Sequence, residues 1–240
     1  KAGNSMVLLG IEAAAKVACA ALYADGHIIA EHRLEGTLTH SETLMPMMDA
    51  VLKEAGRGPE ALTYIALTTG PGSFTGLRIG AATAKGLALG LGIPLIPLST
   101  LEVLAYGAGS SITSMVCVPI MDARRGQVYA AAYHNRQQIL EPQAIAAQEL
   151  AEQLKALHQP CLFMGDAAEL YRPLFQKALL DDYHLAPSHL RELRAGASAA
   201  LAAEKVEKGQ AVLVKGSELT LTYLRKPQAE REREAALHAH

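Results

Sequence analysis

The spacing of apolar residues along the chain predicts an α/β protein. An apolar run over residues 6–11 predicts a buried strand, and the runs over 16–23 and 27–34 flank Asp25-Gly26, which is typical of a tight hairpin. Later apolar runs predict strands over residues 64–67, 93–98, 115–121, 128–133, 161–164 and 212–214. Helical spacing predicts helices over residues 39–55, 75–91, 99–106, 148–157, 167–177 and 190–207, the last of them interrupted at Gly196.

These elements fall into two halves. Residues 6–107 follow the order strand, strand, strand, helix, strand, helix, strand, and residues 112–226 form a second set. The first order resembles the ribonuclease-H-like lobe of the actin, hexokinase and Hsp70 superfamily, a mixed sheet with helices on its faces. We therefore predict two such lobes, the second one reduced. Residues 1–5 and 235–240 are expected to be tail or tag residues.

The helix predicted over residues 39–55 begins at a capping box formed by Thr39 and Glu42 and ends before Gly56. Its apolar positions form one stripe: Leu44, Met48, Val51, Leu52 and Ala55. Met45 and Met47 lie off this stripe, beside Pro46, which should kink the helix. Methionines of this kind are either core residues or an adaptable binding surface, and the core is the better interpretation from sequence.

A glycine-rich turn, Gly-Pro-Gly-Ser-Phe-Thr-Gly-Leu-Arg-Ile-Gly over residues 70–80, follows the strand at 64–67 and leads into a helix. Ser73 or Thr75 can cap the free amides of the first helical turn. Such a turn can bind phosphate, but this spacing fits neither the dinucleotide fingerprint nor a P-loop. A structural turn is therefore the favoured interpretation.

The helix after this turn contains Gly76, Gly80, Gly86 and Gly90. Each glycine costs about 0.5–1 kcal/mol relative to alanine inside a helix, so their presence requires a reason. Small residues let another backbone approach closely. The neighbour is either the sheet of the same lobe or a helix of another subunit, and the sequence leaves both open.

Composition narrows the possible functions. The chain has 240 residues, half of them apolar, and a formal net charge of −2, which does not suggest a protein that grips RNA by itself. No apolar run is long enough to span a bilayer, and no secretory signal is recognisable, so we expect a cytoplasmic protein. Cys19, Cys117 and Cys161 are far apart in apolar runs and are expected to be buried, reduced thiols.

The second half contains one acidic residue of possible catalytic interest. Asp122 ends a predicted strand and could act as a base or metal ligand. Arg124 and Arg125 follow it closely, so a turn residue that pairs locally is the better interpretation.

Five motifs in order along the chain resemble the bacterial TsaB (YeaZ) family. They lie at residues 40–46, 70–80, 122–129, 165–167 and 223–225. The motif residues singled out are Gly70, Pro71, Gly72, Ser73, Phe74, Thr75, Gly76, Arg78, Asp122, Arg124, Gly126, Gly165 and Asp166. The chain departs from the family's usual Ile-Asp-Thr-Ser at the first hairpin, where it has Ile11-Glu12-Ala13-Ala14, so nucleotide chemistry in this lobe is in doubt.

The resemblance implies a non-catalytic partner of TsaD, the transferase that threonylcarbamoylates the tRNA adenosine beside the anticodon. It implies binding to TsaD through the first-lobe helices, homodimer formation through the same surface when alone, a complex joined by the TsaE ATPase, and tRNA contact mainly through the partner. No catalytic, cofactor or metal residue is expected, and ATP only in the assembled complex. The predicted interface residues are Met45, Met48, Leu52, Gly76, Ile79, Gly80, Thr83 and Gly86.

Two other classes of function remain as alternatives. An ATP-dependent small-molecule kinase of the same superfamily would need an aspartate at the place of Glu12 and a later glycine-rich adenosine loop. A metallopeptidase would need a motif such as H-E-x-x-H, which the sequence lacks.

Overall fold

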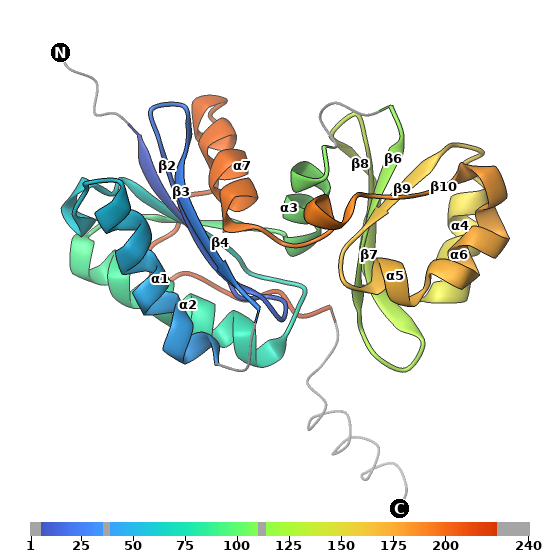
Figure 1. The fold of residues 1–240 in the computed structure, drawn as a ribbon, viewed down its shortest axis with the longest axis horizontal. Coiled ribbons are helices and arrows are strands. Elements are labelled where there is room, and N and C mark those ends of the chain that lie inside the picture. Colours follow the sequence, from blue (N-terminus) through green and yellow to red (C-terminus); the bar gives the residue numbers. More distant parts are fainter. Residues whose placement is uncertain (1–5, 36–38, 110–113, 225–240) are drawn as a thin grey trace, which may run out of the picture.

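The structure is a computed structural model that describes residues 6–35, 39–109 and 114–224. It contains two five-stranded mixed sheets, each with helices packed against it (Figure 1). The strand orders are β3-β2-β1-β4-β5 and β10-β9-β6-β7-β8. Within the described ranges, every helix is too short or too polar to cross a lipid bilayer. The expected tail residues 1–5 and 235–240 lie outside the described residues.

The first sheet begins with the predicted antiparallel meander. Its strands are β1 (Val7–Glu12), β2 (Ala18–Ala24), β3 (His27–Leu34), β4 (Tyr64–Thr68) and β5 (Leu95–Leu98). β4 runs parallel to β1, and β5 runs parallel to β4. The turn at Asp25-Gly26 has positive φ at both residues, which is the geometry that its sequence predicts.

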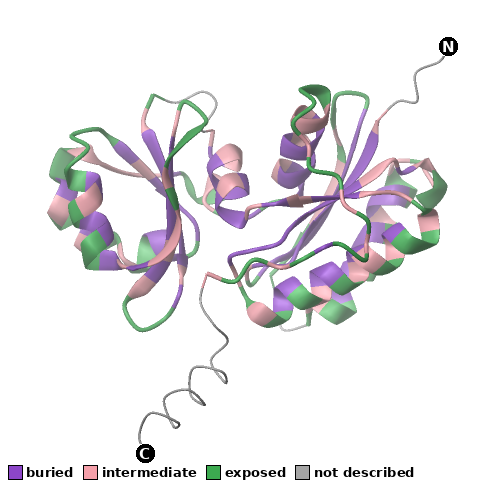
Figure 2. Ribbon diagram, turned by 180° about the vertical axis from the view of Figure 1, so that it is seen from behind, coloured by how far each residue is buried: buried purple, intermediate pink, exposed green. Residues whose placement is uncertain are grey.

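Helices cover both faces of this sheet. α1 (His40–Glu54) and α2 (Phe74–Leu91) lie on the outer face, and α7 (Ala195–Glu207) lies on the inner face, next to α3 (Thr100–Gly107) (Figure 1). Successive residues of β1 point to opposite faces, so Leu9 packs with α1 and α2 whereas Leu8 packs with α3 and α7. β1 is therefore buried along its whole length, as Figure 2 shows by colour.

The second sheet has its helices on the side away from the first half. Its strands are β6 (Val116–Asp122), β7 (Gln127–His134), β8 (Gln137–Ala146), β9 (Cys161–Met164) and β10 (Tyr183–Leu185). Its helices are α4 (Ala147–Lys155), α5 (Ala167–Leu170) and α6 (Arg172–Leu179). The single helix predicted over 167–177 is thus two helices, and Pro173 lies at the start of the second, where proline is tolerated.

The C-terminal part of the chain returns to the first sheet. α7 begins at Ala195 and not near residue 190, and it contacts β1, β2 and β4. Further on, Val214 pairs with Leu95 at the sheet edge, and the Thr222 amide donates to the Thr69 carbonyl at 2.8 Å. We predicted that residues 112–226 form the second lobe. In the structure, the described residues from 195 onward pack largely on the first half instead.

Candidate functional site

The glycine-rich turn connects the end of β4 to the start of α2. Ser73 is the N-cap of α2, and its hydroxyl accepts a hydrogen bond from the Gly76 amide at 3.2 Å. The Ser73 amide itself donates to the carbonyl of Ala14, in the β1–β2 loop, at 2.7 Å. The peptide bond between Gly70 and Pro71 is cis. Two of the amides near this helix end, those of Ser73 and Gly76, are thus used within the chain.

The chain's own backbone occupies the space beside these glycines. A Cβ atom on Gly70 would lie closer than 3.0 Å to the Thr222 carbonyl oxygen, and a Cβ atom on Gly72 would lie 2.5 Å from the Ala14 carbonyl oxygen. Gly70 also has φ +131, which other residues rarely adopt. The close approach of backbone at both glycines supports the structural interpretation of the turn.

Glu12, at the end of β1, is the acid that stands where the family usually has aspartate. Its side chain is 1% exposed. Thr68 Oγ1 donates to Glu12 Oε2 at 2.6 Å, and the Ser198 hydroxyl of α7 donates to Oε1. Burial raises the pKa of Glu12 to about 8. This acid is sealed between protein elements and does not face a ligand site.

The glycines of α2 divide into an inward and an outward pair. Gly76 and Gly80 are buried, and a Cβ at Gly80 would lie 3.2 Å from the Ala13 Cβ. Gly86 and Gly90 are exposed, and a Cβ at either would meet nothing within 4 Å. The first pair therefore serves packing within the fold, and only the second pair is open to a partner.

The predicted interface residues are divided in the same way. Met48 and Leu52 are 3% and 5% exposed and belong to the core beneath α1, and Met47, predicted to lie off the apolar stripe, is buried with them. Gly76 and Gly80 are also buried. Met45 is 55% exposed, Ile79 and Thr83 are half-buried, and Gly86 is exposed. The predicted interface thus included both core and surface residues. Met48 and Leu52 lie on the same side of α1 as Leu44, and this side packs against the sheet.

The C-terminal segment packs against the start of α2 through a contact between two aromatic rings. The Phe74 and Tyr223 ring centroids are 5.2 Å apart, and the Arg78 guanidinium lies 3.7 Å from the Phe74 centroid. The contacts from Phe74 were not predicted, and sequence spacing could not show them because Tyr223 is distant along the chain. The late motif at residues 223–225 was the available signal, although residue 225 lies outside the described ranges.

Asp122 is a turn residue, as its neighbours predict. Its Oδ1 accepts from the Arg124 amide at 2.8 Å, and its own amide donates to Asp166 Oδ1 at 3.1 Å. Burial raises the pKa of Asp166. Gly165 has φ +100 and lies against the Ile120 carbonyl, which explains why glycine precedes this aspartate. Gly126, also at positive φ, completes the Arg124-Arg125 turn.

A cavity of about 280 Å³ lies between the two halves. It is lined by apolar residues such as Leu104 and Met121, with Lys16, Asp166 and Arg191 among its polar groups. The described residues include no cluster of three or more His, Cys, Asp or Glu side chains suited to a metal ion. The three cysteines are buried and unpaired with one another, as expected.

Comparison with known proteins agrees with this fold. The family model of TsaD, tRNA N6-adenosine threonylcarbamoyltransferase, matches residues 35–233. The tRNA threonylcarbamoyladenosine biosynthesis protein TsaB of Bacillus subtilis is 34% identical over 178 residues, which cover 72% of this chain and 77% of that protein. TsaB of Escherichia coli is 38% identical over 128 residues, covering 53% and 55%. A threonylcarbamoyltransferase of Nitratidesulfovibrio vulgaris is 34% identical, but only 33% of its length is covered.

Solved structures give the class and then the family. ROK hexokinase from Thermus thermophilus matches over 82% of this chain and 99% of that one, with a TM-score of 0.51 and 13% identity, so the chain has the actin- and hexokinase-type fold of two ribonuclease-H-like lobes. YeaZ from Pseudomonas aeruginosa matches with a TM-score of 0.76 and 25% identity over 91% of this chain and all of that one. The chain belongs to the TsaB (YeaZ) family.

Proposed function

We propose that this chain acts in the synthesis of threonylcarbamoyladenosine in tRNA as a non-catalytic partner of a TsaD-type transferase. The observation that supports the proposal is that the chain's own residues occupy the space around the first hairpin. Glu12 is buried under α7, and the glycine turn is occupied by the chain's own backbone. A lobe built in this way offers packing surfaces and leaves the transfer chemistry to the partner.

The partner surface in this proposal is the exposed side of the two outer helices. We call it the α1–α2 outer face and define it by Met45, Arg78, Ala82, Gly86 and Leu89. Leu89 is 84% exposed, an unusual degree for a large apolar residue on a helix. A groove of about 710 Å³ at the C-terminal end of α2 is lined by Leu89, Ile93 and Pro94. Burying this apolar surface would favour association.

The same surface would also serve a second copy of the chain in a homodimer when no transferase is present. We expect no cofactor for this chain alone, and ATP only in the assembled complex, through a TsaE-type ATPase. A formal net charge of −2 supports tRNA contact mainly through the partner. A role in tRNA modification fits the cytoplasm.

The test is binding and reconstitution with one matched pair of variants. Leu89→Arg places a charge on the outer face, whereas Leu170→Arg places the same charge on a 61% exposed leucine of the second half. Each variant is mixed with a TsaD-type transferase for co-purification, and with TsaD, TsaE, tRNA and threonylcarbamoyl-adenylate for modification. Leu89→Arg should lose both binding and stimulation, and Leu170→Arg should keep both.

Two results would overturn the proposal. Undiminished tRNA modification when this chain is omitted would remove its role in the pathway. Normal co-purification of a folded Leu89→Arg variant would remove the α1–α2 outer face as the partner surface.

The kinase alternative is not favoured. The relatives of the chain carry TsaB names, and the hexokinase at 13% identity shares the fold alone. Glu12 is also enclosed by Thr68 and Ser198, so it is unable to reach a nucleotide while α7 is docked. Phosphorylation of a sugar by the purified chain would revive this alternative.

A further inference from the structure

Glu12 lies where three elements from distant parts of the sequence meet. It ends β1, Thr68 ends the neighbouring strand β4, and Ser198 lies in the first turns of α7. Glu12 and Ser198 are 1% and 0% exposed, and their side chains are hydrogen-bonded to each other. The contact joins residues 186 positions apart, so it reports directly on whether α7 is docked.

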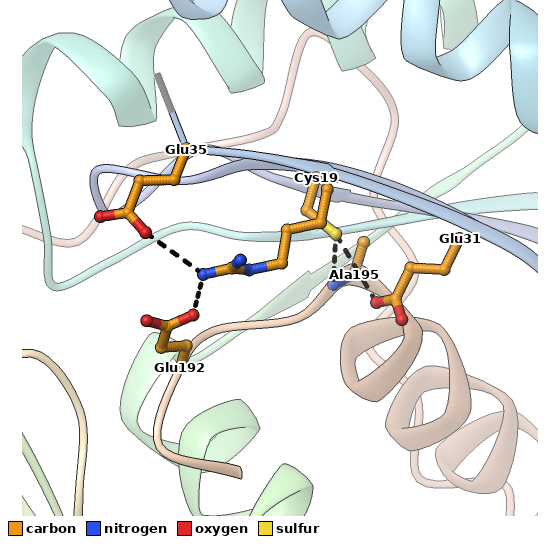
Figure 3. A network of polar contacts seen from close by, with 6 residues as sticks. Cys19, Glu31, Glu35, Glu192 and Ala195 are labelled. Carbon is orange, nitrogen blue, oxygen red and sulfur yellow. Dashed lines mark hydrogen bonds and ion pairs between the residues drawn. The ribbon is translucent and has the colours of Figure 1, made fainter. Parts of the chain in front are cut away.

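The first turn of α7 is pressed closely against the sheet at this place. A Cβ on Gly10 would lie closer than 3.0 Å to the Ala195 carbonyl oxygen. The Gly196 amide donates to Glu31 Oε1 at 2.8 Å. The Ala195 amide donates to Cys19 Sγ at 3.3 Å (Figure 3). Cys19 therefore lies directly beneath the start of α7 and is fully buried by it.

Docking of α7 also affects how the two halves are joined. α7 contacts α3, and α3 contacts β6 and β7 of the second sheet. The segment that leads into α7 crosses between the halves, where Glu192 forms an ion pair with Arg33 of β3 (Figure 3). Glu192 and Leu193 of this segment also line the cavity between the halves. A change at the start of α7 would therefore reach both the crossing segment and the cavity.

We propose that the protonation state of Glu12 controls the packing of α7 on the first sheet. The protonated carboxyl group stabilises the contact with the first turn of α7, and deprotonation weakens it. In the protonated state the direction of the bond between Glu12 and Ser198 reverses, so that the carboxyl group donates to Ser198 Oγ and Ser198 Oγ donates to the Arg194 carbonyl oxygen 3.4 Å away. Thr68 continues to donate to the other carboxyl oxygen. All three polar groups are satisfied in this state.

Among the residues that the structure describes, no cation lies beside the deprotonated carboxylate. The polar and charged groups that face this region are Cys19 from β2, Glu31 from β3, Thr68 from β4, and Arg194 and Ser198 from α7. The Arg194 guanidinium is paired with Glu31. A buried carboxylate held only by two hydroxyl groups is costly, and opening of α7 would return it to water. Burial raises the pKa of Glu12 to about 8, within a range that experiments reach easily.

Cys19 provides the measurement, since a thiol reagent reaches it only when α7 opens. Cys161 in β9 is the internal reference, because it is equally buried but packs with the helices of the second half and not with α7. The ratio of labelling rates at Cys19 and Cys161 cancels the ordinary pH dependence of thiol reactivity in the opened state. For the unmodified protein we expect this ratio to rise by up to about tenfold per pH unit between pH 6 and 7.5 and to level off above about pH 8.

Two variants test the role of the carboxyl group. In Glu12→Gln the ratio should stay flat across the same pH range, because the amide does not titrate. In Ser198→Ala, Cys19 should be labelled faster at pH 6, because α7 loses its hydrogen bond to Glu12. A flat ratio in the unmodified protein, or an equal rise in Glu12→Gln, would overturn the proposal. If Glu12→Gln does not fold, the labelling ratios of the Ser198→Ala variant and of the unmodified protein still test the proposal.

Discussion

The carbonyl oxygen of Ala13 occupies the place where a side chain on Gly76 would begin. A Cβ built on Gly76 would lie closer than 3.0 Å to this oxygen, which belongs to the loop after β1. α2 therefore approaches the first hairpin backbone to backbone, and this approach explains the inner pair of its glycines. The outer pair, at Gly86 and Gly90, has no such neighbour.

Gly76→Ala should destabilise the protein, and Gly86→Ala should not. The first substitution forces backbone apart in a tightly packed place, and we expect a loss of about 3 kcal/mol in the free energy of unfolding. The second introduces the better helix former at an open position and should stabilise by about 0.5–1 kcal/mol. Urea unfolding of both variants measures the difference. Equal effects would show that the two glycines have the same environment.

The methionines of α1 should separate into core and surface by stability. Met48→Ala removes a side chain that is 3% exposed and should cost about 2–5 kcal/mol. Met45→Ala changes a residue that is 55% exposed and should stay within about 0.5 kcal/mol of the unmodified protein. Thermal unfolding measures both. A costly Met45→Ala substitution in the isolated protein would contradict the placement of this residue on the outer face.

Global stability should fall as pH rises through neutrality. Burial raises the pKa of Glu12 from its ordinary 4.5 to about 8, so the folded state binds this proton more tightly than the unfolded state. The stabilisation is complete below about pH 4.5 and is lost as pH rises toward 8, at up to about 1.4 kcal/mol per pH unit.

Denaturant unfolding between pH 6 and 7.5 isolates this contribution. Glu42 and Glu169 have lowered pKa values, since hydrogen bonds favour their charged forms, and their contributions are lost only at acidic pH. Glu12→Gln should remove most of the slope in this window. A slope that survives the substitution unchanged would assign it to another group.

The aromatic stack at the start of α2 should stabilise the C-terminal segment. Tyr223→Ala removes the ring that packs on Phe74 and should cost about 0.5–1.5 kcal/mol beyond the lost apolar burial. Tyr223→Phe keeps the ring and should keep the stability. Unfolding of the two variants tests this, and an equal loss in both would assign the effect to the hydroxyl group.

Elements with a strong local pattern were predictable. The hairpin at Asp25-Gly26, the capping box at Thr39 and the helix after Ser73 all occur as expected. β8 and β10 were missed because both are edge strands with little burial, so they lack the apolar pattern that identifies a strand. Polar residues such as Gln137 and Gln138 begin β8 and conceal it.

The sequence indicated that the glycine turn does not fit a phosphate loop. The partner surface on the first-lobe helices was implied only by the family resemblance, and it stays a prediction. The apolar stripe correctly separated buried Met48 from exposed Met45, but the predicted interface included both, and Met47 was wrongly placed off the stripe. The reason is that helical spacing relates residues to one another, whereas exposure depends on what covers each face.

The sequence by itself determined the order of most elements, their caps, and the family to which the motifs point. Only the tertiary structure decided that α7 and the segment to Thr222 return to the first sheet, that Glu12 is sealed by Ser198, and that the inner glycines of α2 meet backbone. Local patterns depend on the geometry of one helix or strand and are therefore readable along the chain. Contacts between distant segments depend on how whole layers pack, and no spacing within the sequence encodes them.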